Sequence, residues 1–237
     1  MAFPRWIPVP LLAVGLLHLP AVATAQVAVG QTDTFEDGTT QGWVINLLGM
    51  GSPPAPPVNI PTGGPAGEDD NYLQLTAVGG ERAGGRLGVI NFNGQWAGDY
   101  RAAGVGALEM DLFNAGTSDL FIRILIADPG AGPPMNVAIS ATPFSLPAGS
   151  GWTHAVFPLF GPGSLIAELG SVATALTNAT EVRIYHSPDP TLPPPPVVGV
   201  LGVDNITATP VPEPATVLLM GTGLAALFLG RRRQRSR

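Results

Sequence analysis

Short segments in which apolar and polar residues alternate recur along the middle of the chain. In residues 108–112 the apolar side chains point to one side, and Glu109 and Asp111 point to the other, as in a strand with one buried face. Turns rich in Gly, Asn, Asp and Pro separate such segments at intervals typical of an antiparallel sandwich. The pattern predicts an all-β fold, with its clearest strands at residues 42–48, 72–76, 86–92, 107–113, 120–127, 135–140, 153–158, 181–186 and 200–208.

One segment has helical periodicity instead. Ser164 is positioned to cap it, and its apolar residues recur at helical spacing, at Leu165, Leu169, Val172 and Leu176. Gly170 weakens the middle of this segment, so we expect one short helix or two broken turns. The glycine- and proline-rich stretches 51–67, 129–134 and 188–196 predict extended loops.

The charged residues of the strands suggest a ligand face. Residues 120–127 are apolar on both sides except for Arg123, which predicts a central strand covered on both faces. If strands 107–113, 120–127 and 181–186 are neighbours, one polar face would hold Glu109, Asp111, Arg123, Arg183 and Tyr185. Two carboxylates, two guanidinium groups and a phenol can bind a sugar through bidentate hydrogen bonds and stacking. The alternative is a solvated face with cross-strand ion pairs.

The first 25 residues have the pattern of a secretory signal peptide. Arg5 gives residues 1–6 a positive charge, residues 7–20 are apolar, and Ala23-Thr24-Ala25 forms a cleavage site. We therefore expect a signal helix, export through the Sec translocon and cleavage by signal peptidase after Ala25. The alternative is an uncleaved membrane anchor, which three prolines disfavour, at Pro8, Pro10 and Pro20.

The last 27 residues, 211–237, form a three-part pattern. The triplet Pro212-Glu213-Pro214 cannot lie inside a helix, because proline lacks a backbone donor. Residues 215–230 are uncharged, and as a helix they would span roughly 24 Å, slightly less than a hydrocarbon core of about 30 Å. We expect a transmembrane helix there, held on the cytoplasmic side by Arg231, Arg232, Arg233, Arg235 and Arg237.

Composition excludes several function classes. Residues 26–210 suit one exported domain, and their sixteen acids against five arginines give a net charge of −11, with no lysine in the chain. Such a surface would repel nucleic acid. Cysteine is absent, which excludes thiol nucleophiles and cysteine metal sites. The two histidines left after processing, His154 and His186, do not have a metal-binding spacing.

The order of proline-bounded motif, apolar span and arginine cluster at 211–237 resembles the PEP-CTERM sorting signal of Gram-negative bacteria. The resemblance implies that a membrane-embedded exosortase recognises Pro212, Glu213 and Pro214 and cuts near them. The protein would then cross the inner membrane, remain anchored transiently, and reach the cell surface or the extracellular matrix.

The exported part resembles the galactose-binding-like jelly rolls of exported bacterial proteins, in segments 35–38, 42–43, 71–73, 96–100 and 203–206. The resemblance implies that the first and last strands lie side by side, with nearby carboxylates holding a structural calcium. Glu36 and Asp204 are the candidate ligands, and Asp33 is a third. Calcium takes about six to eight oxygens, so carbonyls and waters would complete the set. Alternatively, Asp204 and Asn205 only shape the entry to the last strand.

Three tryptophans allow two interpretations. Trp43 and Trp96 lie in glycine-containing segments, where a large ring either plugs the end of the core or stacks on a sugar. We favour plugging. Trp152 precedes an alternating strand, and we expect it to pack in the core.

The sequence favours a non-catalytic binding or structural protein of the cell surface or exopolysaccharide matrix, for which extracellular polysaccharide is a candidate partner. One alternative is a secreted carbohydrate-active enzyme, because Glu109 and Asp111 lie roughly 7 Å apart along a strand, a separation that glycoside hydrolysis allows. Ser150 lies four residues before His154 without a nucleophile elbow, so we assign no catalytic residue. The other alternative is a permanently anchored spacer.

Overall fold

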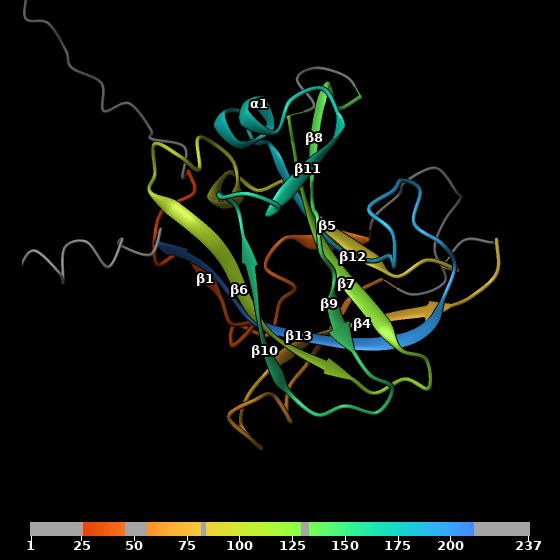
Figure 1. Ribbon diagram of the computed structural model, residues 1–237. Helices are drawn as coiled ribbons and strands as arrows, with labels where there is room; N and C mark the ends of the chain where they lie inside the picture. Colours follow the sequence, from red (N-terminus) through yellow and green to blue (C-terminus); the bar gives the residue numbers. More distant parts are fainter. Residues whose placement is uncertain (1–25, 46–55, 82–83, 129–132, 211–237) are drawn as a thin grey trace, which may run out of the picture.

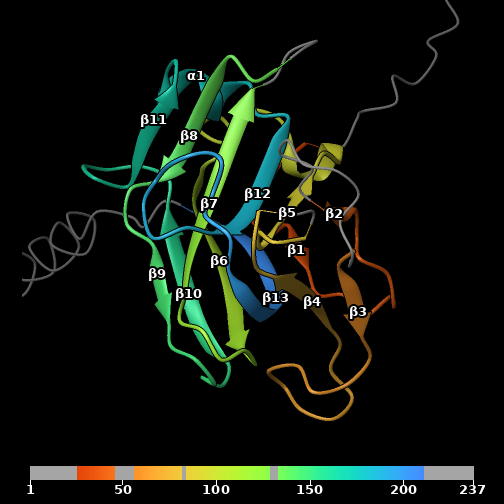
Figure 2. The same cartoon turned by 90° about the vertical axis from the view of Figure 1, so that its right-hand side faces the viewer.

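The chain folds into two antiparallel sheets packed face to face (Figures 1 and 2), in a computed structural model that describes residues 26–45, 56–81, 84–128 and 133–210. Sheet A has the order β10 (Thr153–Pro158), β6 (Val105–Asn114), β13 (Val198–Pro210), β4 (Tyr72–Val78), β3 (Val58–Ile60), and β1 (Thr32–Asp33) also pairs with β13. Sheet B has the order β11 (Leu165–Leu169), β8 (Asn136–Ser140), β7 (Leu120–Asp128), β12 (Glu181–His186), β5 (Gly88–Asn91), β2 (Trp43–Ile45), and β9 (Phe144–Leu146) also pairs with β7. The predicted all-β sandwich is confirmed.

Alternation of apolar and polar residues located most strands correctly. All nine predicted segments contain a strand, although residues 46–48 of the first lie outside the described residues. On β6, Leu108, Met110 and Leu112 are fully buried, whereas Glu109 and Asp111 are only partly buried. Strand β7 is covered on both faces, as predicted. The alternation did not predict the short strands β1, β3 and β9.

The segment predicted as helical contains a strand followed by a helix. Residues 165–169 form β11 at the edge of sheet B, and α1 (Val172–Thr177) follows. Ser171, not Ser164, is the N-cap, and it accepts a hydrogen bond from Thr174 N–H. Gly170 separates the two elements with φ +62°, and a Cβ there would lie 2.3 Å from Asn136 Oδ1. This backbone conformation ends any helix running through residue 170.

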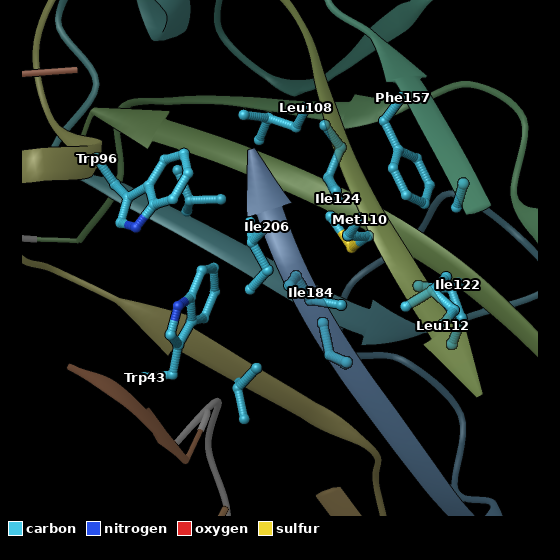
Figure 3. Packing of buried hydrophobic residues seen from close by; sticks show 14 of the residues in the cluster. Trp43, Trp96, Leu108, Met110, Leu112, Ile122, Ile124, Phe157, Ile184 and Ile206 are labelled. Carbon is cyan, nitrogen blue, oxygen red and sulfur yellow. The ribbon is translucent and has the colours of Figure 1, made fainter. Parts of the chain in front are cut away.

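The main core lies between the sheets (Figure 3), and the indole rings of Trp43 and Trp96 belong to it. Trp43 and Trp96 are fully buried, with ring centroids 6.3 Å apart. Their N–H groups donate to the same carboxylate oxygen, Asp33 Oδ2, at 2.8 and 2.7 Å. The two rings therefore pack in the core and have no exposed face on which a sugar could stack.

The first and last strands of the domain lie side by side in sheet A. Thr32 and Asp33 of β1 pair with Thr207 and Ile206 of β13. The β13 ladder is irregular between Asp204 and Thr207, and Asn205 has a positive φ of 50°. This bulge turns Asn205 towards the outer face of sheet A, the face that points away from the main core.

Both terminal apolar segments predicted from the sequence, residues 1–25 and 215–230, lie outside the described residues. Among the residues that are described, no helix is long and apolar enough to cross a membrane.

Candidate functional site

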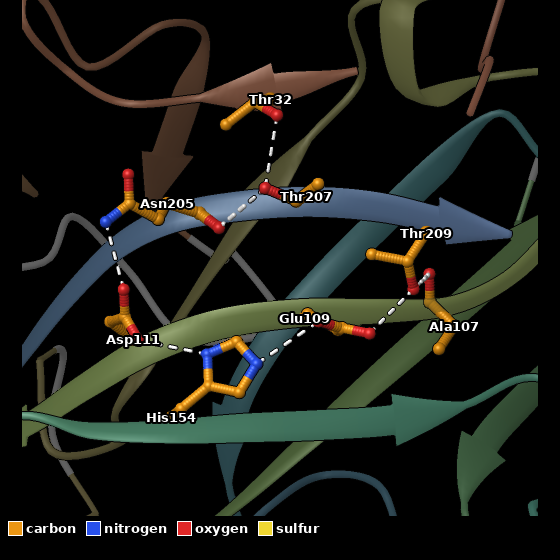
Figure 4. Close-up of polar contacts among 8 residues, drawn as sticks. All are labelled: Thr32, Ala107, Glu109, Asp111, His154, Asn205, Thr207 and Thr209. Carbon is orange, nitrogen blue, oxygen red and sulfur yellow. Dashed lines mark hydrogen bonds and ion pairs between the residues drawn. The ribbon is translucent and has the colours of Figure 1, made fainter. Parts of the chain in front are cut away.

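A row of polar side chains crosses the outer face of sheet A (Figure 4). Glu109 and Asp111 project from β6, and His154 projects from the neighbouring edge strand β10, where it pairs in register with Asp111. The sheet fixes this arrangement, because residues two apart on a strand share a face and directly opposed residues are neighbours.

The imidazole of His154 lies between the two carboxylates. Its Nδ1 is 3.0 Å from Asp111 Oδ1, and its Nε2 is 3.1 Å from Glu109 Oε2. The hydrogen bond with Asp111, followed by that with Glu109, raises the pKa of His154 above its ordinary value, while burial opposes this. Both nitrogens can donate only in the protonated ring, so the arrangement favours the imidazolium form.

Neighbouring strand β13 holds both carboxylates from the other side. Asn205 Nδ2 donates to Asp111 Oδ2 at 2.9 Å, and Thr209 Oγ1 donates to Glu109 Oε1 at 2.9 Å. The side chains of Glu109 and Asp111 remain 29% and 22% exposed, against 57% for His154. The carboxylates are thus positioned by hydrogen bonds and still accessible to a ligand.

Aromatic rings lie on the same outer face, one in line with Glu109 and Asp111 on β6 and one in line with His154. Phe113 follows Asp111 by two residues on β6, and Trp152 precedes His154 by two residues. Their ring centroids are 5.3 Å apart, and Tyr72 packs edge-on against Trp152 at 5.3 Å. Gly202 of β13 lies beneath them, and a Cβ there would come within 3.0 Å of both Phe113 and Trp152.

The prediction that Trp152 packs in the main core is wrong. The ring is half-buried on the outer face of sheet A, where its N–H donates to Gly63 O at 2.9 Å. The apolar partners of Trp152 are aromatic side chains of that outer face, which alternation along a single strand does not reveal.

The structure also separates the predicted ligand face. Arg123, Arg183 and Tyr185 share the outer face of sheet B, whereas Glu109 and Asp111 lie on sheet A. The prediction of one shared face is therefore wrong for these three residues, because β6 is not a neighbour of β7 or β12. Periodicity assigned the sides of each strand correctly but could not pair the strands.

The covering segment, residues 187–197 between β12 and β13, lies over part of this face, and all three side chains are buried. Arg123 donates to the carbonyl oxygens of Ser187, Pro188 and Ser140, and burial lowers its pKa. Arg183 forms a buried ion pair with Glu181. Tyr185 is fully buried in a second apolar cluster, against which Leu192 of the covering segment packs. Burial raises the pKa of Tyr185.

A third feature is an acidic pocket beside the bulge of β13. It is open to solvent and is lined by Thr34, Glu36, Ala66, Glu68, Asp69, Asp70 and Asn205. Asp204 lies next to it, is fully buried, and its Oδ2 has no hydrogen-bond partner among the described residues. Burial, with smaller contributions from Asp70, Asp111 and Glu36, raises the pKa of Asp204 to about 7.

A comparison with protein families identifies the C-terminal segment, which lies outside the described residues. Residues 210–233 match the model of the PEP-CTERM protein-sorting motif. The chain carries a PEP-CTERM sorting motif. The described domain ends where this motif begins, because β13 ends at Pro210. No curated protein matches the chain.

Solved structures with the same architecture place the described domain among jelly rolls. An exo-β-agarase aligns with a TM-score of 0.55 and 13% identity, over 78% of this chain and 26% of that one. The solution structure of CtCBM11 aligns with a TM-score of 0.51 and 18% identity, over 78% and 98%. A family 11 carbohydrate-binding module from Clostridium thermocellum was solved with a β-1,3-1,4-mixed-linked tetrasaccharide. It aligns with a TM-score of 0.48 and 16% identity, over 77% of this chain and 97% of that one.

The chain thus has the jelly-roll fold of carbohydrate-binding modules, and it spans about a quarter of the agarase that it matches. At these identities the likeness shows the fold alone. The implied adjacency of the first and last strands agrees with the pairing of β1 and β13.

Among the three candidate calcium ligands, the structure separates Asp33 from the other two. Asp33 accepts hydrogen bonds from both core indoles and from Gln31 and Gln95. Glu36 lines the acidic pocket beside Asp204, and its Oε1 accepts a hydrogen bond from Asn71 N–H at 2.9 Å. No cluster of three or more His, Cys, Asp or Glu suited to a metal occurs in the described parts of the chain.

Sequence reasoning considered His154 as a metal ligand and as a catalytic partner of Ser150, and it missed the place of His154 in this site. Strand 153–158 alternates so that His154 and Val156 point outwards, which places the imidazole on a polar face. Only the register of β10 against β6 brings it between Glu109 and Asp111.

Proposed function

We propose that this chain is an exported, non-catalytic protein that exosortase sorts to the cell surface or extracellular matrix of a Gram-negative bacterium. Residues 1–25 would be a cleaved signal peptide, residues 26–210 the exported domain and residues 211–237 the sorting signal. The match to the PEP-CTERM motif supports this route. The exosortase would recognise Pro212, Glu213 and Pro214, and the apolar span would anchor the precursor before processing.

The exported domain would bind carbohydrate on the outer face of sheet A. One observation carries this proposal: on this face the rings of Phe113 and Trp152 lie next to the polar group formed by Asp111, Glu109 and His154. Rings provide apolar surface for a pyranose, and fixed carboxylates accept hydrogen bonds from its hydroxyls. The fold shared with carbohydrate-binding modules agrees with this role.

Glycan arrays with the detergent-solubilised full-length protein test the proposal. We expect binding to at least one extracellular polysaccharide and a loss of about tenfold, or about 1.4 kcal/mol, in Trp152→Ala. Phe92→Ala is the control, because Phe92 is an exposed aromatic residue that follows β5 of sheet B and does not belong to this face. Absence of any glycan binding would instead favour the anchored-spacer alternative.

The enzyme alternative predicts a different result. Glu109 and Asp111 share a single imidazole on one sheet face, whereas glycoside hydrolysis needs two carboxyls on opposite sides of the scissile bond. The agarase likeness covers 26% of that chain. Degradation of a polysaccharide by the purified protein, with loss of activity in Glu109→Gln, would replace the non-catalytic proposal.

A structural calcium held by Glu36 and Asp204 belongs to the same proposal. The buried, unpartnered Oδ2 of Asp204 and its raised pKa show a carboxylate that lacks a counter-charge in the described residues. Glu36 beside it and nearby carbonyl oxygens would supply further ligands. A bound calcium would stabilise the junction of the first and last strands.

A further inference from the structure

The indole ring of Trp152 is held by a loop from a distant part of the chain. Trp152 precedes β10, whose pairing with β6 begins one residue later, so no sheet ladder fixes its backbone. Its N–H donates to the carbonyl oxygen of Gly63 at 2.9 Å, and Gly63 lies in residues 61–71, the loop between β3 and β4. Ring contacts with Phe113 and Tyr72 limit where the indole lies, and the hydrogen bond fixes the direction of its N–H edge.

The peptide group that accepts this hydrogen bond is held from its other side by Asp70. The carbonyl of Gly63 and the N–H of Gly64 belong to one planar peptide unit, and that N–H donates to the carbonyl oxygen of Asp70 at 2.9 Å. The Asp70 carboxylate accepts a hydrogen bond from Ala66 N–H. It also packs directly against Gly64, where a Cβ would lie 2.5 Å from Asp70 Oδ2. Asp70 therefore determines which way the Gly63 carbonyl points.

The residue after Asp70 connects the loop to the body of the sandwich. Asn71 N–H donates to Glu36 Oε1 at 2.9 Å. The side-chain Nδ2 of Asn71 donates to the carbonyl oxygen of Phe35 and to Asn59 Oδ1, both at 3.2 Å. Phe35 is fully buried in the main core. A continuous series of contacts thus runs from the core, through Asp70, to the indole on the outer face of sheet A.

We propose that Asp70 is a positioning residue of the carbohydrate-binding face, and that it acts on Trp152 through the Gly63–Gly64 peptide. This inference rests on the proposed carbohydrate-binding function and names a residue beside the face on which that function depends. The indole N–H is the only donor of the ring and is engaged by Gly63, so Trp152 offers a sugar its ring surface alone. Such contacts need a fixed ring, because a gap of about 0.5–1 Å already loses roughly a quarter to a half of their energy.

Hydrogen exchange at the indole N–H groups tests the inference, measured by NMR on the detergent-solubilised full-length protein with isotope-labelled tryptophan. We expect Asp70→Ala to speed exchange at Trp152 at least tenfold, because the loop loses the acceptor for Ala66 N–H and the packing against Gly64. Gly64→Ala should have the same effect with Asp70 still present, because the new Cβ would displace the carboxyl group.

Two further variants separate the hydrogen bond from the charge. Asp70→Asn keeps an acceptor oxygen and should leave exchange at Trp152 near the wild-type rate. Asp69→Ala is the matched control, because Asp69 is an exposed carboxylate that lines the same acidic pocket and accepts no hydrogen bond among the described residues. In every variant the buried indoles of Trp43 and Trp96 should exchange at the wild-type rate, which shows that the core is intact.

Glycan arrays with the same proteins connect the position of the ring to binding. Glycans bound by the wild type should lose at least about threefold in apparent affinity in Asp70→Ala and in Gly64→Ala. They should bind Asp70→Asn and Asp69→Ala with wild-type affinity.

Four results would overturn the inference. The first is unchanged exchange at Trp152 in both Asp70→Ala and Gly64→Ala. The second is an effect of Asp69→Ala as large as that of Asp70→Ala, which would assign the effect to charge. The third is faster exchange at all three indoles, which would make Asp70 a residue of the fold as a whole. The fourth is faster exchange at Trp152 without a loss on the arrays. Absence of any glycan binding by the wild type would instead overturn the proposed function, and the exchange rates would still show whether Asp70 positions the ring.

Discussion

At the scale of single residues, Asp33 has a structural role that its position in the sequence did not indicate. The resemblance to jelly rolls made it a third candidate for calcium, but its Oδ2 accepts the N–H groups of Trp43 and Trp96. Burial raises the pKa of Asp33, and the indole hydrogen bonds oppose that shift. Its carboxylate therefore satisfies two donors that would otherwise be buried without partners.

We expect Asp33→Ala to lower the free energy of unfolding by roughly 2–6 kcal/mol, because it leaves two buried indole donors unsatisfied at about 1–3 kcal/mol each. Urea unfolding followed by tryptophan fluorescence measures the change. Asp189→Ala is the control, since Asp189 is exposed and should change stability by less than about 0.5 kcal/mol. Equal stability of the two variants would contradict this role for Asp33.

Asp204 gives a second prediction, in which pH and calcium act on the same group. Its pKa of about 7 in the folded protein lies above the ordinary aspartate value of 3.8, so the folded state binds more protons than the unfolded state between these pH values. With a chelator present, the melting temperature should fall as pH rises from about 4 to 7. Calcium added at pH 7.5 should raise it again, because the cation compensates the ionised carboxylate.

Asp204→Asn should abolish both effects, and Asp189→Asn should abolish neither. Differential scanning calorimetry with and without chelator measures them. If calcium does not shift the wild-type melting temperature at pH 7.5, the proposed site at Glu36 and Asp204 is wrong.

At the scale of elements, Arg123 fastens the segment that covers sheet B. Its guanidinium donates to three carbonyl oxygens, two of them at the start of that segment and the third on β8. We expect Arg123→Met, which keeps the apolar stem but removes these donors, to speed amide exchange at Thr191 and Val197 at least tenfold. Hydrogen–deuterium exchange with mass spectrometry measures this.

Arg101→Met serves as the control for that experiment. Arg101 is an exposed arginine that lies 4.8 Å from the ring centroid of Phe160, away from the covering segment. Its loss should leave exchange at Thr191 and Val197 unchanged. Unaltered exchange in Arg123→Met would show that apolar packing of Leu192 alone holds the segment.

The strands and the helix also differ in how well the sequence predicted them, and the reason is physical. Eight of the nine predicted strands place apolar side chains in the main core, and the ninth, β8, places Val137 and Ile139 in the second cluster, so each was evident from its apolar positions. In residues 165–169 the apolar side chains belong to an exposed edge strand, so their spacing reflected no buried helix face. The positive φ of Gly170 separates this strand from α1, and hydrophobic periodicity does not predict a backbone conformation of this kind.

At the scale of the whole molecule, the sorting motif begins where the last described strand ends. Strand β13 pairs with β6 as far as Pro210, and the motif covers residues 210–233. Cleavage near Pro212–Pro214 would therefore leave the pairing of β13 intact. We expect mass spectrometry of the surface form to detect no peptides from residues 218–237.

A variant with Pro212, Glu213 and Pro214 all replaced by alanine is the control, because it should retain those peptides in the membrane fraction. Peptides from residues 218–237 in the mature surface form of the wild type would contradict sorting by cleavage.

The sequence by itself determined the fold class, the sides of most strands and the PEP-CTERM sorting motif, because these depend on local periodicity or on residues adjacent in the chain. Only the tertiary structure decided which faces meet. It assigned β6 and β12 to different sheets and buried Arg183 and Tyr185. It also placed His154 between Glu109 and Asp111. Strand order and register depend on contacts between residues far apart in sequence, and a two-residue period is compatible with many pairings.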